Sequence, residues 1–168
     1  MATELQLAWL KTVVTPAQMS AREYGVPASV TLAQCILESA WGSSQLARRY
    51  NNYFGIKALP GQPYIEFATD EVVASRTVRE LARFTKYPSA IECFEAHARL
   101  LATAERYAPA MRHTSDVAGF CAALRMCGYS TEPTYAFRLI SLIDEFDLEQ
   151  YDLPLPPDAP AQAVEEAA

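Results

Sequence analysis

The sequence contains no run of about 18 consecutive apolar residues, which is the length that a membrane-spanning helix needs. Its first 19 residues, MATELQLAWLKTVVTPAQM, also lack the basic start and the uninterrupted apolar core of a secretory signal peptide. We therefore expect a protein that does not insert into a membrane and that is synthesised in the cytoplasm without a signal peptide.

Potential metal ligands are also scarce. The chain has two histidines, His97 and His113, and none of its four cysteines forms a CxxC pair. Zinc sites commonly use such pairs, so we expect no metal and no other cofactor. Cys35 and Cys93 lie in apolar helical patterns and are interpreted as small buried hydrophobic residues, although an even number of cysteines would also permit disulfides.

Basic residues are fewer than acidic residues. The chain has 14 Lys and Arg against 20 Asp and Glu, for a net charge of -6. A nucleic-acid-binding domain would carry a basic stripe, so we expect no nucleic-acid partner. Four of the acidic residues lie in 152–168, DLPLPPDAPAQAVEEAA, a Pro/Ala-rich segment without aromatic residues. This composition predicts a disordered tail, or one ordered only by a partner.

Residues 1–151 are long enough to form one domain, and 51% of the whole chain is hydrophobic. Residues 58–87 contain turn residues and two partly alternating segments, 64–69 and 76–87, which predict a small β-hairpin lobe. RELARF (79–84) could equally be helical. Elsewhere apolar periodicity predicts helices over 3–14, 15–24, 26–42, 43–50, 89–104, 115–128 and 133–146.

The helix boundaries rest on local signals. Thr15 followed by Pro16 predicts the start of a second helix, and Gly42 predicts the end of the third. Ser115 is expected to cap the helix that ends near Gly128. In the last helix, Phe137 is expected on the buried face together with the isoleucines that follow it.

One acidic residue stands alone in 26–42, VPASVTLAQCILESAWG, where Glu38 is the only charged side chain. Burying a carboxylate costs several kcal/mol unless it is compensated, and desolvation raises its pKa. Proteins tolerate this mainly where a protonated acid is useful near neutral pH. The local pattern alone fits a general acid and a helix cap or solvent-facing position about equally well.

Three segments resemble motifs of one enzyme family: PASVTLAQCILESAWGSSQLA (27–47) followed by NNYFGIK (51–57), FTKYPSAIECFEAHARLL (84–101) and GYSTEPTYA (128–136). In order and spacing they are similar to the peptidoglycan N-acetylglucosaminidases of glycoside hydrolase family 73, which are related to the flagellar muramidase-like hydrolases. The resemblance covers about residues 10–148. It implies a mostly α (α+β) fold, a lysozyme-like helical domain with a small β-hairpin lobe.

The resemblance also implies the catalytic groups. Glu38 occupies the position of the glutamate in the family's ES-x-WG motif, which implies the general acid. The family's T-x-E word in the hairpin corresponds to Thr69-Asp70-Glu71 and implies Glu71 as the second carboxylate. Asp70 and Glu66 stay open as competitors, because strand alternation puts them on the opposite face from Glu71. Glu71 could also be an ordinary solvated charge.

Substrate-binding residues are expected near these carboxylates. Tyr129 and Tyr135 resemble the family's cleft tyrosines, and an aromatic ring can stack on a sugar while its phenol forms a hydrogen bond. Tyr135 could instead belong to the core, and so could Trp41, which would otherwise form the floor of the cleft beside Glu38. Asn52 and Phe54 are expected to shape the loop beneath the hairpin.

Several other polar residues are interpreted as structural. Glu92 forms a capping-box pattern with Ser89, and His97 reads as an interior histidine rather than a catalytic group. The chain has Glu132 where the family usually has aspartate, which puts one local hydrogen bond in doubt.

Together these features predict an enzyme that cleaves the β-1,4 glycosidic bond of peptidoglycan after N-acetylglucosamine. A lytic transglycosylase, which needs one acid, and a non-catalytic wall-binding module are the alternatives. We expect an exported antibacterial effector of the type VI secretion kind, acting in the periplasm or wall of a target cell and neutralised by a cognate periplasmic immunity protein. A phage-type endolysin is the alternative route to the wall.

Overall fold

The computed structural model describes residues 3–73 and 76–152, apart from the side chains of residues 69–80. It is mostly helical with one antiparallel hairpin, as predicted. The elements are α1 (Glu4–Tyr24), α2 (Ala28–Ser39), α3 (Gln45–Tyr50), β1 (Tyr64–Val73), β2 (Arg76–Thr85), α4 (Ala90–Thr103), α5 (Val117–Met126) and α6 (Tyr135–Glu145), with 3-10 helices η1 (Glu105–Tyr107), η2 (Ala110–His113) and η3 (Leu148–Tyr151).

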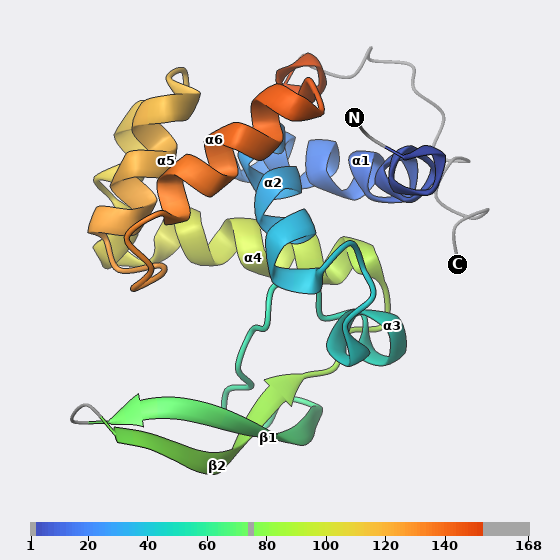
Figure 1. Cartoon of the computed structure of the whole chain (residues 1–168), viewed down its shortest axis with the longest axis vertical. Helices are drawn as coiled ribbons and strands as arrows, with labels where there is room; N and C mark the ends of the chain where they lie inside the picture. Colours follow the sequence, from blue (N-terminus) through green and yellow to red (C-terminus); the bar gives the residue numbers. More distant parts are fainter. Residues whose placement is uncertain (1–2, 74–75, 153–168) are drawn as a thin grey trace.

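Helix α2 occupies the middle of the helical body, with α1, α4, α5 and α6 around it (Figure 1). Its residues from Ala28 to Ile36 are all buried, because no charged side chain precedes Glu38 and the helix can therefore pack on every face. Cys35 of α2 and Cys93 of α4 are both fully buried, as predicted, and the four cysteines are free thiols. A rigid, buried helix thus carries Glu38 in its last turn.

The hairpin β1–β2 projects from one side of the helical body, next to α3 (Figure 1). Phe67 pairs with Ala82 across the hairpin, and its ring contacts Tyr50 with the ring centroids 6.2 Å apart. On the opposite face, exposed Glu66 forms a 3.0 Å ion pair with Arg83. Strand alternation therefore separates a face toward the body from a solvent face.

Asn52 ties the base of the hairpin to the body. Its buried side-chain amide donates hydrogen bonds of 2.9 Å to the carbonyl oxygens of Ile56 and Thr85 and accepts one of 2.9 Å from the Ile56 N–H. Thr85 ends β2, so these bonds join the loop after α3 to the second strand. Asn52 shapes the loop beneath the hairpin, as predicted.

The predicted break between two helices at Thr15 and Pro16 was wrong, since α1 runs without interruption through Pro16. A proline inside a helix costs about 3 kcal/mol or more, because it has no N–H to donate and crowds the preceding turn. Here Leu10, Val13 and Ala17 are buried against neighbouring helices on both sides of the proline. Burial of this long face offsets the local cost.

Helix α2 ends three residues earlier than the predicted stop at Gly42. Ala40, Trp41 and Gly42 follow it with φ values of 50°, 59° and 69°, so that three consecutive residues are left-handed. The Ser39 hydroxyl holds this turn by accepting a 2.7 Å hydrogen bond from the Gly42 N–H. A side chain at position 42 would overlap the indole of Trp9, which explains the need for glycine there.

Two further boundaries differ from the predictions. Asp116, rather than Ser115, caps α5 by accepting a 2.9 Å hydrogen bond from the backbone of Gly119. In α6, Phe137 is 71% exposed, so its predicted place on the buried face was wrong. The buried stripe is formed by Tyr135, Leu139 and Ile143, which are spaced four residues apart and face α2 and α5.

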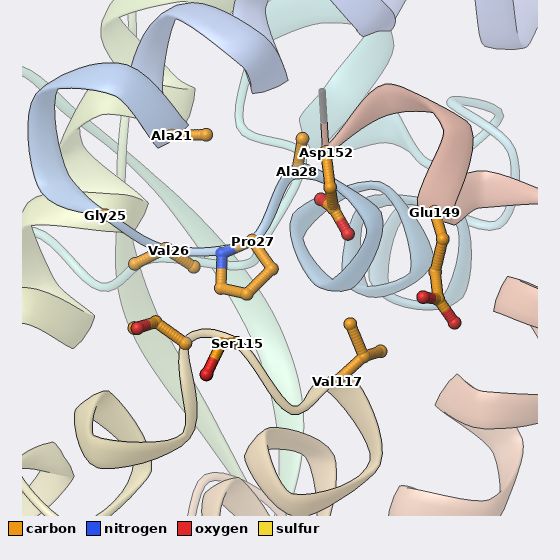
Figure 2. Close-up of a pocket in the computed structure, with 10 residues that line it drawn as sticks. Ala21, Gly25, Val26, Pro27, Ala28, Ser115, Val117, Glu149 and Asp152 are labelled. Carbon is orange, nitrogen blue, oxygen red and sulfur yellow. The ribbon is translucent and has the colours of Figure 1, made fainter. Parts of the chain in front are cut away.

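Asp152, which we assigned to the tail, is bonded to the start of α2. Its carboxylate accepts hydrogen bonds of 2.8 Å from the Ser29 N–H and 2.6 Å from the Ser29 hydroxyl. Pro27 offers α2 no side-chain cap, so Asp152 supplies the missing acceptor. Figure 2 shows Asp152 beside this helix end, at a pocket of about 310 Å³. The predicted disorder of 153–168 lies outside the described residues and stays a prediction.

Candidate active site

A cleft of about 980 Å³ opens on the surface of the helical body beside the base of the hairpin. The C-terminal end of α2 contributes Glu38, and the face of α4 and the loop before α6 supply other walls. The described residues that line the cleft are Glu38, Phe54, Gly55, Ile56, Lys57, Leu59, Gln62, Tyr87, Ala96, His97, Arg99, Leu100, Thr103, Arg106, Tyr107, Gly128, Tyr129 and Ser130.

Glu38 combines access to solvent with a desolvated carboxyl group. The residue is exposed on its cleft side, which differs from the fully sequestered position that the apolar pattern suggested. Burial by the surrounding protein nevertheless raises the pKa of the Glu38 carboxyl, outweighing the hydrogen bond from Tyr135 and the charge of Arg138, which both lower it. Glu38 is therefore protonated to a higher pH than an ordinary glutamate.

Tyr135 holds the Glu38 carboxyl group in place. Its phenol donates a 3.1 Å hydrogen bond to Oε1 of Glu38 and accepts one of 3.1 Å from the Gln34 side-chain amide. Burial raises the pKa of Tyr135 and the nearby Glu38 charge raises it further, so that the phenol stays protonated and able to donate. Tyr135 is a core residue that does not line the cleft, and it contacts the cleft through its hydrogen bond to Glu38.

Tyr129 lines the cleft next to this pair. Its ring stacks on that of Tyr135, with 5.6 Å between the centroids, and its hydroxyl lies 3.2 Å from Nε2 of His97. His97 is fully buried and stacks on Phe54 at 3.9 Å. Burial lowers the pKa of His97 to about 3, so the imidazole is neutral near pH 7. A packed column of rings thus leads from Phe54 to the tyrosine that contacts Glu38.

Three of the predicted substrate-binding residues lie outside the cleft lining: Tyr135, Trp41 and Asn52. Trp41 packs edge-on against Trp9 and Phe146, with centroid distances of 5.5 Å and 4.8 Å, so core packing accounts for it. Asn52 is 1% exposed, and both N–H groups of its amide are engaged with backbone carbonyls. Its position indicates a structural role rather than contact with a ligand.

Glu71 cannot be placed in the same way as Glu38. The structure describes its backbone in β1, paired with Val78, while its side chain lies outside the described residues. Glu66 lies on the solvent face of the hairpin, in its exposed ion pair with Arg83.

Sequence reasoning missed two residues that act on Glu38. Gln34 lies four residues before Glu38, one helical turn away, and reaches it through Tyr135. Arg138 follows Tyr135 by three residues, forms a 2.8 Å ion pair with Glu132, and is close enough to lower the pKa of Glu38. Gln34 lies one helical turn from Glu38, and Arg138 lies one helical turn from Tyr135. This spacing was the signal from which both could have been predicted.

Neither a metal site nor a membrane span emerges from the part of the chain that the structure describes. Within it, no three His, Cys, Asp or Glu side chains are grouped closely enough to hold a metal ion. None of its helices has the length and apolarity that crossing a bilayer requires.

Comparisons with known proteins agree with this fold and site. Residues 14–148 match the glucosaminidase family, described as mannosyl-glycoprotein endo-beta-N-acetylglucosaminidase. The exo-glucosaminidase LytG of Bacillus subtilis is 32% identical over 152 residues, which cover 88% of this chain and 54% of LytG. The chain thus spans about half the length of this curated relative.

Solved structures share the fold. The catalytic domain of the autolysin Auto from Listeria monocytogenes is 31% identical with a TM-score of 0.79, covering 90% of this chain and 89% of that one. A type VI secretion system effector–immunity complex from Pseudomonas protegens, 21% identical with a TM-score of 0.60 and covering 89% and 95%, shows the fold alone. The lysozyme-like fold is confirmed, and the chain belongs to the glucosaminidase family, glycoside hydrolase family 73.

Proposed function

We propose that this chain is a glycoside hydrolase that cleaves the β-1,4 bond after N-acetylglucosamine in peptidoglycan. One observation carries the proposal. Glu38 stands at the end of a buried helix, opens into a cleft of about 980 Å³, and has a pKa that burial raises. Hydrolysis of a glycosidic bond needs a protonated carboxyl group beside the leaving oxygen, and Glu38 has the environment of such a group.

The hydrogen bond from Tyr135 supports the role of Glu38 as general acid. Because the phenol donates to Oε1 of Glu38, that oxygen acts as an acceptor and the transferable proton belongs on Oε2. The bond also fixes the rotation of the carboxyl group, which keeps the proton directed to one place. Positioning of this kind contributes to catalysis in addition to the pKa.

We propose Glu71 as the second carboxylate. Glu66 is the weaker candidate, since it lies on the solvent face and is paired with Arg83. A carboxylate on the hairpin, across the cleft from Glu38, could stabilise the oxocarbenium-like transition state or activate the attacking water.

Product analysis tests the bond that is cleaved. Purified peptidoglycan is digested, the products are reduced with borohydride, and the new ends are identified by mass spectrometry. Reduced N-acetylglucosamine ends are expected. Reduced N-acetylmuramic acid ends would instead indicate a muramidase, and anhydromuramyl ends a lytic transglycosylase. Release of no new ends would favour a non-catalytic wall-binding module.

A matched pair of variants links the products to the cleft. Glu38→Gln is expected to release no reducing ends above background, while Glu149→Gln is expected to match the wild type. Glu149 is a glutamate at the pocket of Figure 2, beside the opposite end of α2 from Glu38. Equal loss in both variants would point to a general charge effect rather than to acid catalysis.

We also propose that this activity serves an antibacterial effector whose immunity protein covers the cleft. An open cleft beside Glu38 supports this, since it is the surface that such an inhibitor has to occupy. Expression in the cytosol should be tolerated, whereas the same chain with an export signal should lyse the host, and Glu38→Gln should not. If the exported chain lyses the host and no product of a neighbouring gene prevents the lysis, the result would favour the endolysin.

A further inference from the structure

The charge of the cleft is opposite to the charge of the chain. The chain has a net charge of -6, yet the described residues that line the cleft include the cations Lys57, Arg99 and Arg106 and one carboxylate, Glu38. In a protein with more acidic than basic residues, this concentration of positive charge creates a local field that attracts anions.

Most of this charge lies along one wall. Ala96, Arg99, Leu100 and Thr103 follow the i, i+3, i+4, i+7 spacing in α4 and therefore share the helix face that lines the cleft. Arg106, in η1, continues the wall. We call the pair Arg99 and Arg106 the basic wall. Both residues are exposed, so their guanidinium groups are available to a ligand in the cleft.

Arg106 is held in position by its surroundings. Its guanidinium lies 4.7 Å from the centroid of the Tyr107 ring and donates a hydrogen bond to the carbonyl oxygen of Gly128. Gly128 directly precedes Tyr129, so the basic wall is connected to the aromatic side of the cleft. An arginine fixed in this way loses less conformational freedom when it binds a carboxylate.

The basic wall does not serve the catalytic acid. The cation that acts on the Glu38 carboxyl is Arg138 of α6, which does not line the cleft. A neutral sugar chain with acetamido groups also gives an arginine pair no anion to bind. The cations in the cleft therefore match a charged group carried by the substrate.

We propose that the basic wall binds the carboxylate groups of the peptide stems attached to the glycan, and so favours stem-bearing strands over bare ones. This rests on the proposed function, since it concerns the same cleft and the same polymer. Stems hang from the muramic acid residues that alternate with N-acetylglucosamine, so they lie beside any bond cleaved in the cleft. The planar guanidinium can form two parallel hydrogen bonds with a carboxylate.

Binding measurements on an inactive background test the wall without depending on catalysis. Isothermal titration calorimetry of Glu38→Gln compares soluble strands that carry stems with strands from which an amidase has removed them, leaving the lactyl carboxylate. The stem-bearing strands should bind more tightly. Adding Arg99→Gln should weaken their binding roughly threefold to tenfold, the range for exposed to partly ordered charge pairs. Binding of the stripped strands should be unchanged.

Two controls sharpen the result. Adding Arg112→Gln, which removes an exposed arginine of η2 outside the cleft lining, should leave both affinities as they were. Raising the ionic strength should reduce the preference for stems in the Glu38→Gln protein, and should have a smaller effect once Arg99 is also replaced and only Arg106 of the wall remains.

Equal affinity for the two kinds of strand, or an equal loss on both with Arg99→Gln, would overturn the inference. The latter result would assign the wall to the lactyl carboxylate or to the glycan itself. Cleavage assays with the wild type answer the separate question of activity. If neither kind of strand is cleaved, the proposed function fails, while the titrations still decide whether the basic wall binds the carboxylates of the stems.

Discussion

The phenol of Tyr135 donates a 3.1 Å hydrogen bond to Oε1 of Glu38 across 97 residues of sequence. Tyr135 is itself fixed by Gln34 and by its place in the core, so the bond connects the Glu38 carboxyl group to the rigid interior. It lowers the pKa of Glu38 while burial raises it. The acid strength of Glu38 therefore results from two opposing effects that substitutions can separate.

Replacing Tyr135 with Phe should raise the pKa of Glu38, because the hydrogen bond that stabilises the ionised form is lost. A general acid is active while protonated, so activity falls as the pH rises through its pKa. The alkaline limb of the kcat/KM profile should therefore move to higher pH. Tyr64→Phe, on the hairpin, should leave the limb in place. A shift to lower pH would contradict the assignment of Glu38.

Glu38→Gln should lower kcat by about 10²–10⁴-fold, the usual contribution of general acid catalysis. The stability of the Glu38→Gln variant, unlike its activity, should not decrease. A carboxyl whose folded pKa is raised costs stability once the pH exceeds its unfolded pKa, so the variant should melt no lower than the wild type at pH 7. Below the unfolded pKa this advantage should vanish. Calorimetry at both pH values measures the difference.

Glu71→Gln should impair turnover more than substrate binding, since we place this carboxylate opposite Glu38 in the reaction. Glu66→Gln should be nearly silent, because Glu66 is exposed and paired with Arg83 on the solvent face. Asp70→Asn provides the register control. Initial rates on purified peptidoglycan compare the three variants, and a larger defect in Asp70→Asn than in Glu71→Gln would move the catalytic position by one residue.

His97 should make the protein sensitive to acid. Burial lowers the pKa of His97 from 6.5 to about 3. Between these pH values the unfolded chain therefore binds a proton at His97 and the folded protein does not. Stability should therefore be lost as the pH falls from 6.5 toward 3, at about 1.4 kcal/mol per pH unit for one proton. Urea unfolding across this range should show a steeper decline for the wild type than for His97→Gln.

A direct readout of His97 is available from NMR. Its ring resonances should stay in the neutral form from pH 8 to pH 5. Protonation with a midpoint near 6.5 would show that water reaches the imidazole, and would remove the expected acid sensitivity.

Asp152→Ala should destabilise the protein by about 0.5–2 kcal/mol, the typical cost of losing a helix cap. The carboxylate accepts both the N–H and the hydroxyl of Ser29 at the start of α2, where Pro27 gives no cap. Thermal melting measures the loss. Glu149→Gln, at the same pocket, should change the melting temperature little, and an equal effect in both variants would indicate a general charge contribution.

Local signals predicted the parts of the fold that neighbouring residues determine. Ser89 caps α4 as expected, and alternation predicted the hairpin although RELARF could have been helical. Glu38 was singled out as a candidate because it is the single charge in an apolar helix. In each case the deciding interaction lies within one turn or one strand.

Long-range packing decided the remainder. Pro16 is accommodated because α1 buries a face on both sides of it, and Phe137 is exposed because α6 presents a different stripe to α2 and α5. Trp41 contacts Trp9, which precedes it by more than 30 residues and forms the surface that receives it. No local pattern contains these partners, so the sequence could not distinguish the alternatives.

The bond between Asp152 and Ser29 also has a practical meaning for protein engineering. Ser29 and Glu38 lie nine residues apart in α2, which corresponds to about 14 Å along the helix axis. A fusion partner joined after Asp152 would therefore be attached at the end of α2 remote from Glu38. Reporter proteins, affinity handles or surface anchors placed there should leave the mouth of the cleft open to a polymeric substrate.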